Sequence, residues 1–114
     1  MKNKNVIDKI KKIIGDKNVL TSEWNRLPYS KGWRYGSGNA LAVLKPCKLS
    51  DIWKILQVCV EEDIIVIMQA ANTGLTGGST PFGNNYDRPV IVVNTMRINS
   101  IHIINNGNQI VGLT

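Results

Sequence analysis

The residues best suited to chemistry lie together in residues 69–81, which read QAANTGLTGGSTP and hold three glycines, one asparagine and four hydroxyl side chains. Glycine allows the backbone to approach a ligand closely and to adopt a positive φ, so successive N–H groups can converge on an anion. Short hydroxyl and amide side chains add hydrogen-bond donors with little bulk. This composition predicts a site for phosphate or diphosphate, with a plain flexible loop as the alternative.

Neither of two familiar phosphate-binding motifs fits this segment. No Gly-Lys-Ser/Thr follows the glycines, so the segment is not a Walker loop. The spacing of Gly74, Gly77 and Gly78 also differs from the Gly-x-Gly-x-x-Gly pattern of dinucleotide-binding proteins. The pattern alone therefore leaves the anion site and the flexible loop both open.

The elements around this segment follow from hydrophobic periodicity. Residues 40–44 and 64–68 are apolar runs typical of buried strands, and residues 51–62 between them carry apolar side chains at helical spacing. Strand, helix and strand form a βαβ unit, and residues 90–93 add a further apolar strand. Residues 69–81 therefore leave the carboxyl end of a buried strand, where open α/β sheets hold their ligands.

The two ends of the chain carry different patterns. Residues 1–20 predict an amphipathic helix packed on the domain, with isoleucines on one face and lysines on the other. Residues 21–39 form a turn-rich aromatic stretch without a clear period. Residues 101–111 predict a hairpin, because the Asn106-Gly107 pair favours a type I′ turn.

The composition is that of a globular domain. The chain has 114 residues, 43% of them hydrophobic and 19% charged, which is about the size and balance of one domain. We expect an α+β fold with a βαβ unit, a small mixed sheet and a C-terminal hairpin. No apolar run approaches the roughly 18 residues of a membrane span, and no apolar segment of a secretory signal follows the first lysines, which predicts a cytoplasmic protein.

Residues that often carry catalysis or bind metals give no such signal here. Cys47, Cys59 and the only histidine, His102, are not at metal-ligand spacing, so no metal site is expected and both cysteines are expected to be reduced. His102 lies in an apolar strand and is expected to be a surface residue. Arg88 and Arg97 could face a phosphate, although exposed arginines are common. No carboxylate pair is placed for acid–base work.

The net charge of +6 comes with six lysines within residues 2–17. A net positive charge of this kind is compatible with binding to nucleic acid, with binding to anionic lipid, or simply with a solvated surface. Because the lysines are not interleaved with stacking aromatics and no groove-reading motif is present, we expect no nucleic-acid partner. A basic amphipathic helix can lie on an anionic membrane surface, which stays the alternative for residues 1–20.

Three segments resemble the quinone-dependent D-lactate dehydrogenases of bacteria. Residues 68–81 with residues 83–88, which read GNNYDR, look like the FAD loop of that family. Residues 36–43, GSGNALAV, resemble the segment that opens its flavin domain, and Met96-Arg97 with Ile101-His102 resembles the strand region that follows. The family belongs to the flavoproteins of the vanillyl-alcohol-oxidase type, whose PCMH-type FAD-binding domain pairs two α+β subdomains around the cofactor.

The resemblance implies an FAD site and a respiratory activity. D-lactate would reduce FAD, which would pass electrons to quinone at the inner face of the cell membrane. The alternatives to ligand contact are that Ala70 and Ala71 only pack under the loop and that Gly77 serves the turn alone. The residues that the resemblance places at the FAD diphosphate and its surroundings are Ala70, Ala71, Asn72, Thr73, Gly74, Gly78 and Ser79.

The resemblance also implies parts that residues 1–114 do not contain. Residues 21–114 would be only part of the PCMH-type domain, the subdomain that binds the FAD diphosphate. A second half of the flavin domain and a substrate-binding cap would follow, so no catalytic residue is assigned and no dehydrogenase activity is expected from these residues alone. The first alternative is a truncated, non-catalytic remnant with weak FAD binding or none. The second is a basic module that binds a membrane surface. A half-site exposes a sheet edge and an apolar face, which predicts self-association.

Overall fold

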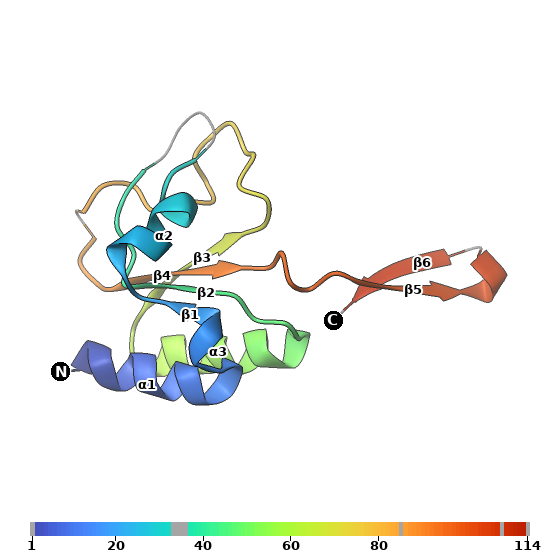
Figure 1. The fold of residues 1–114 in the computed structure, drawn as a ribbon, viewed down its shortest axis with the longest axis horizontal. Helices are drawn as coiled ribbons and strands as arrows, with labels where there is room; N and C mark the ends of the chain where they lie inside the picture. The colour runs from blue at the N-terminus through green and yellow to red at the C-terminus, as the bar shows by residue number, and fades with distance from the viewer. Residues whose placement is uncertain (1, 33–36, 85, 108, 114) are drawn as a thin grey trace.

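A computed structural model describes residues 2–32, 37–84, 86–107 and 109–113 of the chain (Figure 1). Within these ranges the elements are α1 (Lys2–Ile14), η1 (Asp16–Asn18), β1 (Val19–Leu20), α2 (Glu23–Ser30), β2 (Ala42–Leu44), α3 (Leu49–Glu61), β3 (Ile65–Gln69), β4 (Val90–Asn94), β5 (Ser100–Ile104), η2 (Asn105–Gly107) and β6 (Gln109–Leu113). The helices and strands predicted around residues 69–81 are all present, with ends shifted by one or two residues. No helix among the described residues is long and apolar enough to cross a membrane.

Four short strands form a mixed sheet in the order β1-β2-β4-β3. β1 runs antiparallel to β2, whereas β2, β4 and β3 run parallel, with Val92 of β4 paired to Val43 on one side and to Ile67 on the other. β4 thus lies between the two strands that α3 connects. The carboxyl ends of β3 and β4 meet at the pair Gln69 and Asn94, so the segment after β3 begins at the predicted edge of the sheet.

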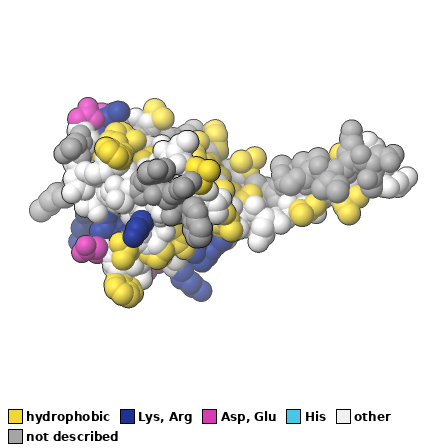
Figure 2. All heavy atoms as spheres, turned by 90° about the horizontal axis from the view of Figure 1, so that it is seen from above, with side chains coloured by type: hydrophobic (Ala, Val, Ile, Leu, Met, Phe, Trp, Pro, Cys, Tyr) yellow, Lys and Arg dark blue, Asp and Glu magenta, His cyan; other side chains and the backbone are white. Residues whose placement is uncertain are grey.

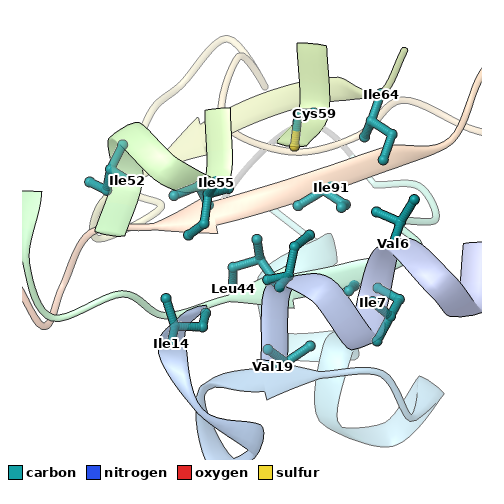
Figure 3. Close-up of a cluster of buried hydrophobic side chains, with 13 residues drawn as sticks. Val6, Ile7, Ile14, Val19, Leu44, Ile52, Ile55, Cys59, Ile64 and Ile91 are labelled. Carbon is teal, nitrogen blue, oxygen red and sulfur yellow. The ribbon is translucent and has the colours of Figure 1, made fainter. Parts of the chain in front are cut away.

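One face of the sheet is covered by α1 and α3 (Figure 1). Side chains from both helices and from the sheet point toward one another in the main core (Figure 3). Complete burial of one isoleucine or leucine side chain stabilises a fold by about 1.5–3 kcal/mol. The buried members are Val6, Ile7, Ile10, Ile14, Val19, Ala42, Leu44, Ile52, Ile55, Cys59, Ile64, Ile91 and Val93. The division of the chain at residue 20 stays a prediction, and α1 packs in this core as expected.

α2 and the long connections lie over the opposite face of the sheet (Figure 1). A smaller cluster of Ala40, Val43 and Val92 is buried there, with Leu20, Tyr29 and Ile67 packed against it. The alternation of side chains along each strand separates the two clusters, because neighbouring residues of a strand point to opposite faces. Residues 69–81 lie over this second face of the sheet, on the same side as α2 (Figure 1).

The prediction of irregular structure throughout residues 21–39 is wrong, because α2 lies within that stretch. Ser22 caps this helix, its Oγ accepting a hydrogen bond from the backbone N–H of Asn25 at 3.2 Å, and Glu23 adds an acidic residue in the first turn. Pro28 inside the helix hides the signal, since proline removes one backbone donor. The cap and the packing of α2 on the sheet, through Tyr29, together offset the proline over a helix of only 8 residues.

The predicted C-terminal hairpin is present, but its turn differs from the prediction. Pairing closes at Ile104 and Gln109, so the loop is longer than the two residues of a type I′ turn. Asn105 and Asn106, with φ of 54° and 53°, are the left-handed residues. The hairpin projects from the body (Figure 1), and Figure 2 shows hydrophobic side chains on this arm, where Ile101 is exposed.

Candidate functional site

The segment predicted to bind an anion starts from a buried pair of side-chain amides. Gln69 ends β3, Asn94 ends β4, and each is only 2% exposed. Burial of an amide without a partner costs about 1–3 kcal/mol, so such groups are nearly always hydrogen-bonded. No buried side-chain polar atom of the described residues lacks a partner.

The amide of Gln69 ties three parts of the chain together. Its Nε2 donates to the backbone oxygen of Tyr29 at 2.8 Å and to that of Ser79 at 2.9 Å. Its Oε1 accepts a hydrogen bond from Nδ2 of Asn94 at 2.9 Å. Nδ2 of Asn94 also donates to the backbone oxygen of Ala70 at 3.1 Å. The two ends of residues 70–79 are therefore held against α2 and β4 by two side chains.

Two further side-chain hydrogen bonds, both made by Asn72, hold the same segment at a greater distance from the sheet. Ser79 Oγ donates to Oδ1 of Asn72 at 2.9 Å, and Nδ2 of Asn72 donates to the backbone oxygen of Lys31 at 2.7 Å. The backbone of Asn72 has a φ of 58°, in the left-handed region that asparagine tolerates better than most residues. Asn72 and Ser79, both predicted to contact FAD, thus use side-chain atoms to shape the loop.

The other predicted site residues are open to solvent. Ala70, Ala71, Thr73, Gly74 and Gly78 are all exposed. A Cβ added at Gly74 would meet nothing within 4 Å, so packing within the described chain does not require glycine there. The same addition at Gly78 would meet only Thr76 Oγ1, at 3.7 Å, an ordinary contact.

Gly77 differs from its neighbours because its φ is 77°, a conformation that favours glycine. Its backbone oxygen accepts a hydrogen bond from the backbone N–H of Thr80 at 3.4 Å, which closes a turn. Gly77 therefore has a role in the turn itself.

The backbone N–H groups of residues 70–79 are available as hydrogen-bond donors. Within the part of the chain that the structure describes, none of its N–H groups donates to another group of the protein. An exposed loop rich in small residues and held at its base presents such groups without reorganisation. The arrangement can bind an anion through several N–H groups at once.

The later part of the connection between β3 and β4, around Gly83, is held in place by a close contact between two glycines. Gly38 and Gly83 form an isolated parallel bridge, and the N–H of Asn39 donates to the oxygen of Gly83 at 3.2 Å. A Cβ at Gly38 would lie 2.7 Å from backbone atoms of Gly83 and 2.8 Å from the carbonyl carbon of Pro81. Glycine at residue 38 is therefore required by the close approach of two backbones.

An open groove lies beside the first half of the segment. Its volume is about 470 Å³, and it is lined by Leu27, Pro28, Lys31, Gly32, Ala71, Asn72 and Thr73. α2 supplies an apolar wall, and the exposed side chain of Lys31 supplies positive charge. The groove has room for part of a cofactor-sized ligand next to the loop.

Two arginines considered for phosphate binding are occupied elsewhere. Arg88 forms ion pairs with Asp63 at 2.9 Å and with Asp87 at 3.3 Å. The hydrogen bond that Arg88 donates to Asp63 is the largest cause that raises the pKa of Arg88. Arg97 donates to Oδ1 of Asn18. Neither side chain is brought to residues 70–79 by a contact of the described chain.

The remaining candidates do not gather into a site. The side chain of His102 lies outside the described residues, and only its backbone pairing with Val111 is seen. Both cysteines are free, with Cys47 exposed and Cys59 buried, and burial raises the pKa of the Cys59 thiol to about 11. The described residues hold no group of three or more His, Cys, Asp or Glu side chains fit for a metal ion.

The residues that hold the base of the loop were not predicted from the sequence. Gln69 and Asn94 each end an apolar strand, and a polar side chain at that point of two parallel neighbours was a usable signal. Tyr29 contributes only a backbone oxygen, which no residue pattern indicates. Lys31 in the groove was missed because α2 was not expected.

Several known dehydrogenases are similar in sequence to this chain over most of its length. The chain is 52% identical over 108 residues to a quinone-dependent D-lactate dehydrogenase of Haemophilus influenzae and 44% identical over 108 residues to that of Escherichia coli. Each match covers 95% of this chain and 19% of the relative. A mitochondrial D-2-hydroxyglutarate dehydrogenase of Arabidopsis thaliana is 30% identical over 75% of the chain and 15% of the relative. No model of a protein family matches the chain.

Solved structures share the fold at low sequence identity. An alkyldihydroxyacetonephosphate synthase superposes with a TM-score of 0.78 at 11% identity, over 90% of this chain and 20% of that one. p-Cresol methylhydroxylase superposes with a TM-score of 0.70 at 17% identity, over 91% of this chain and 20% of that one. The predicted α+β fold of the PCMH type is confirmed.

These comparisons confirm the resemblance inferred from residues 68–81. They also show its extent, since the chain spans about a fifth of the length of the curated relatives that it matches. Nearly the whole chain takes part in the match.

Proposed function

We propose, from its similarity to one segment of the quinone-dependent D-lactate dehydrogenases, that the chain binds the diphosphate of FAD at residues 70–79. The observation that carries this proposal is the set of backbone N–H groups in this segment that donate to no group of the described chain. The open position at Gly74 supports it, because a phosphate can approach the backbone there without a side chain in the way.

The residues present fit such a ligand. Asn72 and Ser79 hold the shape of the loop, while Thr73, Gly74 and Gly78 face solvent and leave their backbone accessible. Ala70 and Ala71 would lie beside the diphosphate and contribute backbone donors. Lys31 in the adjoining groove would add a positive charge that favours an anionic ligand.

The activity of the whole protein belongs to the same proposal. Bound FAD would take a hydride from D-lactate and pass electrons to a quinone, and the chain's own residues would bind and orient the cofactor. The support is that relatives at 44–52% identity are quinone-dependent D-lactate dehydrogenases. We propose that residues 1–114 alone turn over no D-lactate, since they correspond to only a fifth of those proteins. Turnover with a soluble quinone analogue would contradict this.

Binding is tested by titration of residues 1–114 with FAD, followed by fluorescence of the flavin. ADP, which carries the diphosphate, should compete with FAD, whereas riboflavin, which lacks it, should not. Thr73→Glu adds a negative charge beside the proposed diphosphate and should weaken FAD binding by about tenfold or more, a difference of about 1.4 kcal/mol. Thr21→Glu is the matched control, because Thr21 is also exposed and lies outside the loop and groove.

The outcomes separate the proposal from the alternatives. Competition by ADP together with loss only in Thr73→Glu supports a diphosphate site in this loop. A failure of FAD to bind at about 100 µM would favour the non-catalytic remnant. Equal weakening in both variants would show that net charge, not the loop, governs binding.

Attachment to an anionic membrane surface is a further part of the proposal, as is a cytoplasmic location. The favouring observation is that α1 turns lysines outward, among them Lys9 and Lys12. Its apolar face packs in the core, so only charge would act at the membrane. Sedimentation with phosphatidylserine vesicles should fall steeply with salt, and binding that salt leaves unchanged would count against a charge-driven contact.

A further inference from the structure

The side chain of Asn94 makes three hydrogen bonds, and one of them fixes how its amide is oriented. Its Oδ1 accepts a hydrogen bond from the backbone N–H of Met96 at 3.1 Å. Because a backbone N–H can only donate, the amide oxygen faces Met96 and the amide nitrogen faces the start of the loop of residues 70–79. Nδ2 donates to Oε1 of Gln69 at 2.9 Å and to the backbone oxygen of Ala70 at 3.1 Å. Both acceptors of this buried NH₂ group therefore lie at the base of the loop.

The hydrogen bond to Ala70 determines where the next backbone N–H group points. In a trans peptide the C=O and the N–H point in opposite directions. Since the oxygen of Ala70 is held toward Asn94, the N–H of Ala71 points away from Asn94 and from the edge of the sheet. Ala71 is exposed, and no group of the described chain accepts a hydrogen bond from this N–H. The peptide is thus fixed on one side and open on the other.

The surroundings of Ala71 suit an anion. Ala71 lines the open groove of about 470 Å³ that Lys31 also lines, and the exposed side chain of Lys31 brings positive charge there. The next residue, Asn72, has a φ of 58°. A left-handed residue is one of the two conformations whose succession makes neighbouring N–H groups converge on an anion. The N–H of Ala71 therefore lies at a favourable place for a phosphate oxygen.

We propose that Asn94 is the positioning residue of the diphosphate site, because it aims the N–H of Ala71 at the ligand. This inference rests on the proposed binding of FAD, and it adds the backbone group that makes a contact and the side chain that holds that group in place. Asn94 itself touches no ligand, since it is only 2% exposed and both ends of its amide bond to the protein.

The first measurement uses NMR of the unmodified chain. ADP, the probe that carries the diphosphate, is titrated into isotope-labelled residues 1–114. The amide proton of Ala71 should move downfield as ADP binds, because a hydrogen bond to a phosphate oxygen deshields it. The two side-chain amide protons of Asn94 should exchange slowly with water with and without ADP, because both are bonded within the protein.

The variant Asn94→Ser removes the hydrogen bonds to the loop and keeps the local one. A serine hydroxyl can accept from the backbone N–H two residues later, which here is that of Met96, but it is too short to reach Ala70. The dissociation constant of ADP should rise about tenfold, the effect of losing one hydrogen bond to a charged group. The downfield shift of the Ala71 amide at saturating ADP should shrink as well.

Val93→Ala is the matched control. Val93 precedes Asn94 on β4, but its side chain is buried in the main core on the other face of the sheet. Both variants should lower the urea midpoint, whereas only Asn94→Ser should lower the affinity for ADP. The contrast separates the positioning of the loop from a general loss of stability.

The results that would overturn the inference differ from the one that would overturn the proposed function. If ADP shifts no amide of residues 70–79 in the wild type, the proposed site itself is wrong and the inference falls with it. If other amides of the loop shift and that of Ala71 does not, the site stands and the inference is wrong. Equal ADP affinity of Asn94→Ser and the wild type, or an equal loss in Val93→Ala, would remove the positioning role of Asn94.

The wild-type spectra also decide the matter if Asn94→Ser does not fold. Slow exchange of the Asn94 side-chain amide protons together with the downfield shift of Ala71 would support the role of Asn94. Rapid exchange of those protons would contradict it, because a side chain that is not held cannot orient the peptide of Ala70 and Ala71.

Discussion

Nδ2 of Asn94 donates to Oε1 of Gln69 at 2.9 Å, between the last residues of two adjacent parallel strands. This bond fixes which way the Gln69 amide faces, because with Oε1 occupied the Nε2 group must donate. Nε2 then reaches Tyr29 on α2 and Ser79 at the end of the candidate loop. The two side chains thus fix the position of the loop relative to the edge of the sheet.

Replacement of Gln69 should loosen the loop more than the sheet. In Gln69→Ala the oxygens of Tyr29 and Ser79 and one N–H of Asn94 lose their partner, and the free energy of unfolding should fall by about 2–3 kcal/mol. Hydrogen exchange at residues 70–79 should accelerate beyond this global change. Gln57→Ala, at an exposed residue of α3, is the matched control and should change stability by less than about 0.5 kcal/mol. Equal effects of the two variants would contradict the positioning role.

The two glycines at residues 38 and 74 should respond to alanine in opposite ways. Gly38→Ala forces a Cβ against backbone atoms 2.7 Å away and should cost about 1–3 kcal/mol of stability, seen as a lower urea midpoint. Gly74→Ala meets nothing in the chain and should leave stability within about 0.5 kcal/mol. If Gly74 faces a diphosphate, the same change should weaken FAD binding. Normal FAD binding by a stable Gly74→Ala protein would remove that residue from the site.

The Schellman-type end of α3 should depend on a left-handed residue. Asp63 has a φ of 57°, and the N–H of Ile64 donates back to the oxygen of Cys59 at 2.8 Å. A β-branched residue strains this conformation, so Asp63→Val should be about 1–2 kcal/mol less stable than Asp63→Gly. Both variants lose the ion pair with Arg88, so thermal melts of the two isolate the backbone effect. Similar melting temperatures would argue against a left-handed residue 63.

The two thiols should differ in reactivity. Cys47 is exposed and should react with a thiol reagent at neutral pH, whereas Cys59 should react only after denaturation. Burial raises the pKa of Cys59 from 9.0 to about 11, so the folded state keeps a proton that the unfolded state loses in that interval. This contribution to stability is present below pH 9 and is lost as the pH rises through about 11.

Cys59→Ala tests the pH dependence directly. The wild type should lose more stability than the variant between pH 8.5 and 11.5, a range set by the two pKa values of the Cys59 thiol, when urea midpoints are compared. The comparison cancels the contribution of every group that the two proteins share. Identical pH profiles would show that Cys59 does not contribute.

Local pattern in the sequence determined the main elements and the place of the candidate loop. Two kinds of pattern were strong signals. β3 and β4 appear as apolar runs because a strand that is buried on both faces needs apolar residues throughout, and α3 appears as helical periodicity because only one stripe of a helix is buried. The composition of residues 69–81 located the proposed anion site before any contact was known. The motif within it supplied the resemblance to flavoproteins, which composition alone did not.

Tertiary structure decided what the loop residues do. Asn72 was predicted as a ligand contact, yet its side chain is engaged by Ser79 and Lys31, and these partners come from distant parts of the chain. Gln69 reaches Tyr29 across 40 residues, a contact that no local pattern contains. α2 escaped prediction because Pro28 weakens the helical signal, and packing on the sheet compensates for it. Long-range hydrogen bonds and packing depend on which elements become neighbours, and only the folded chain settles that.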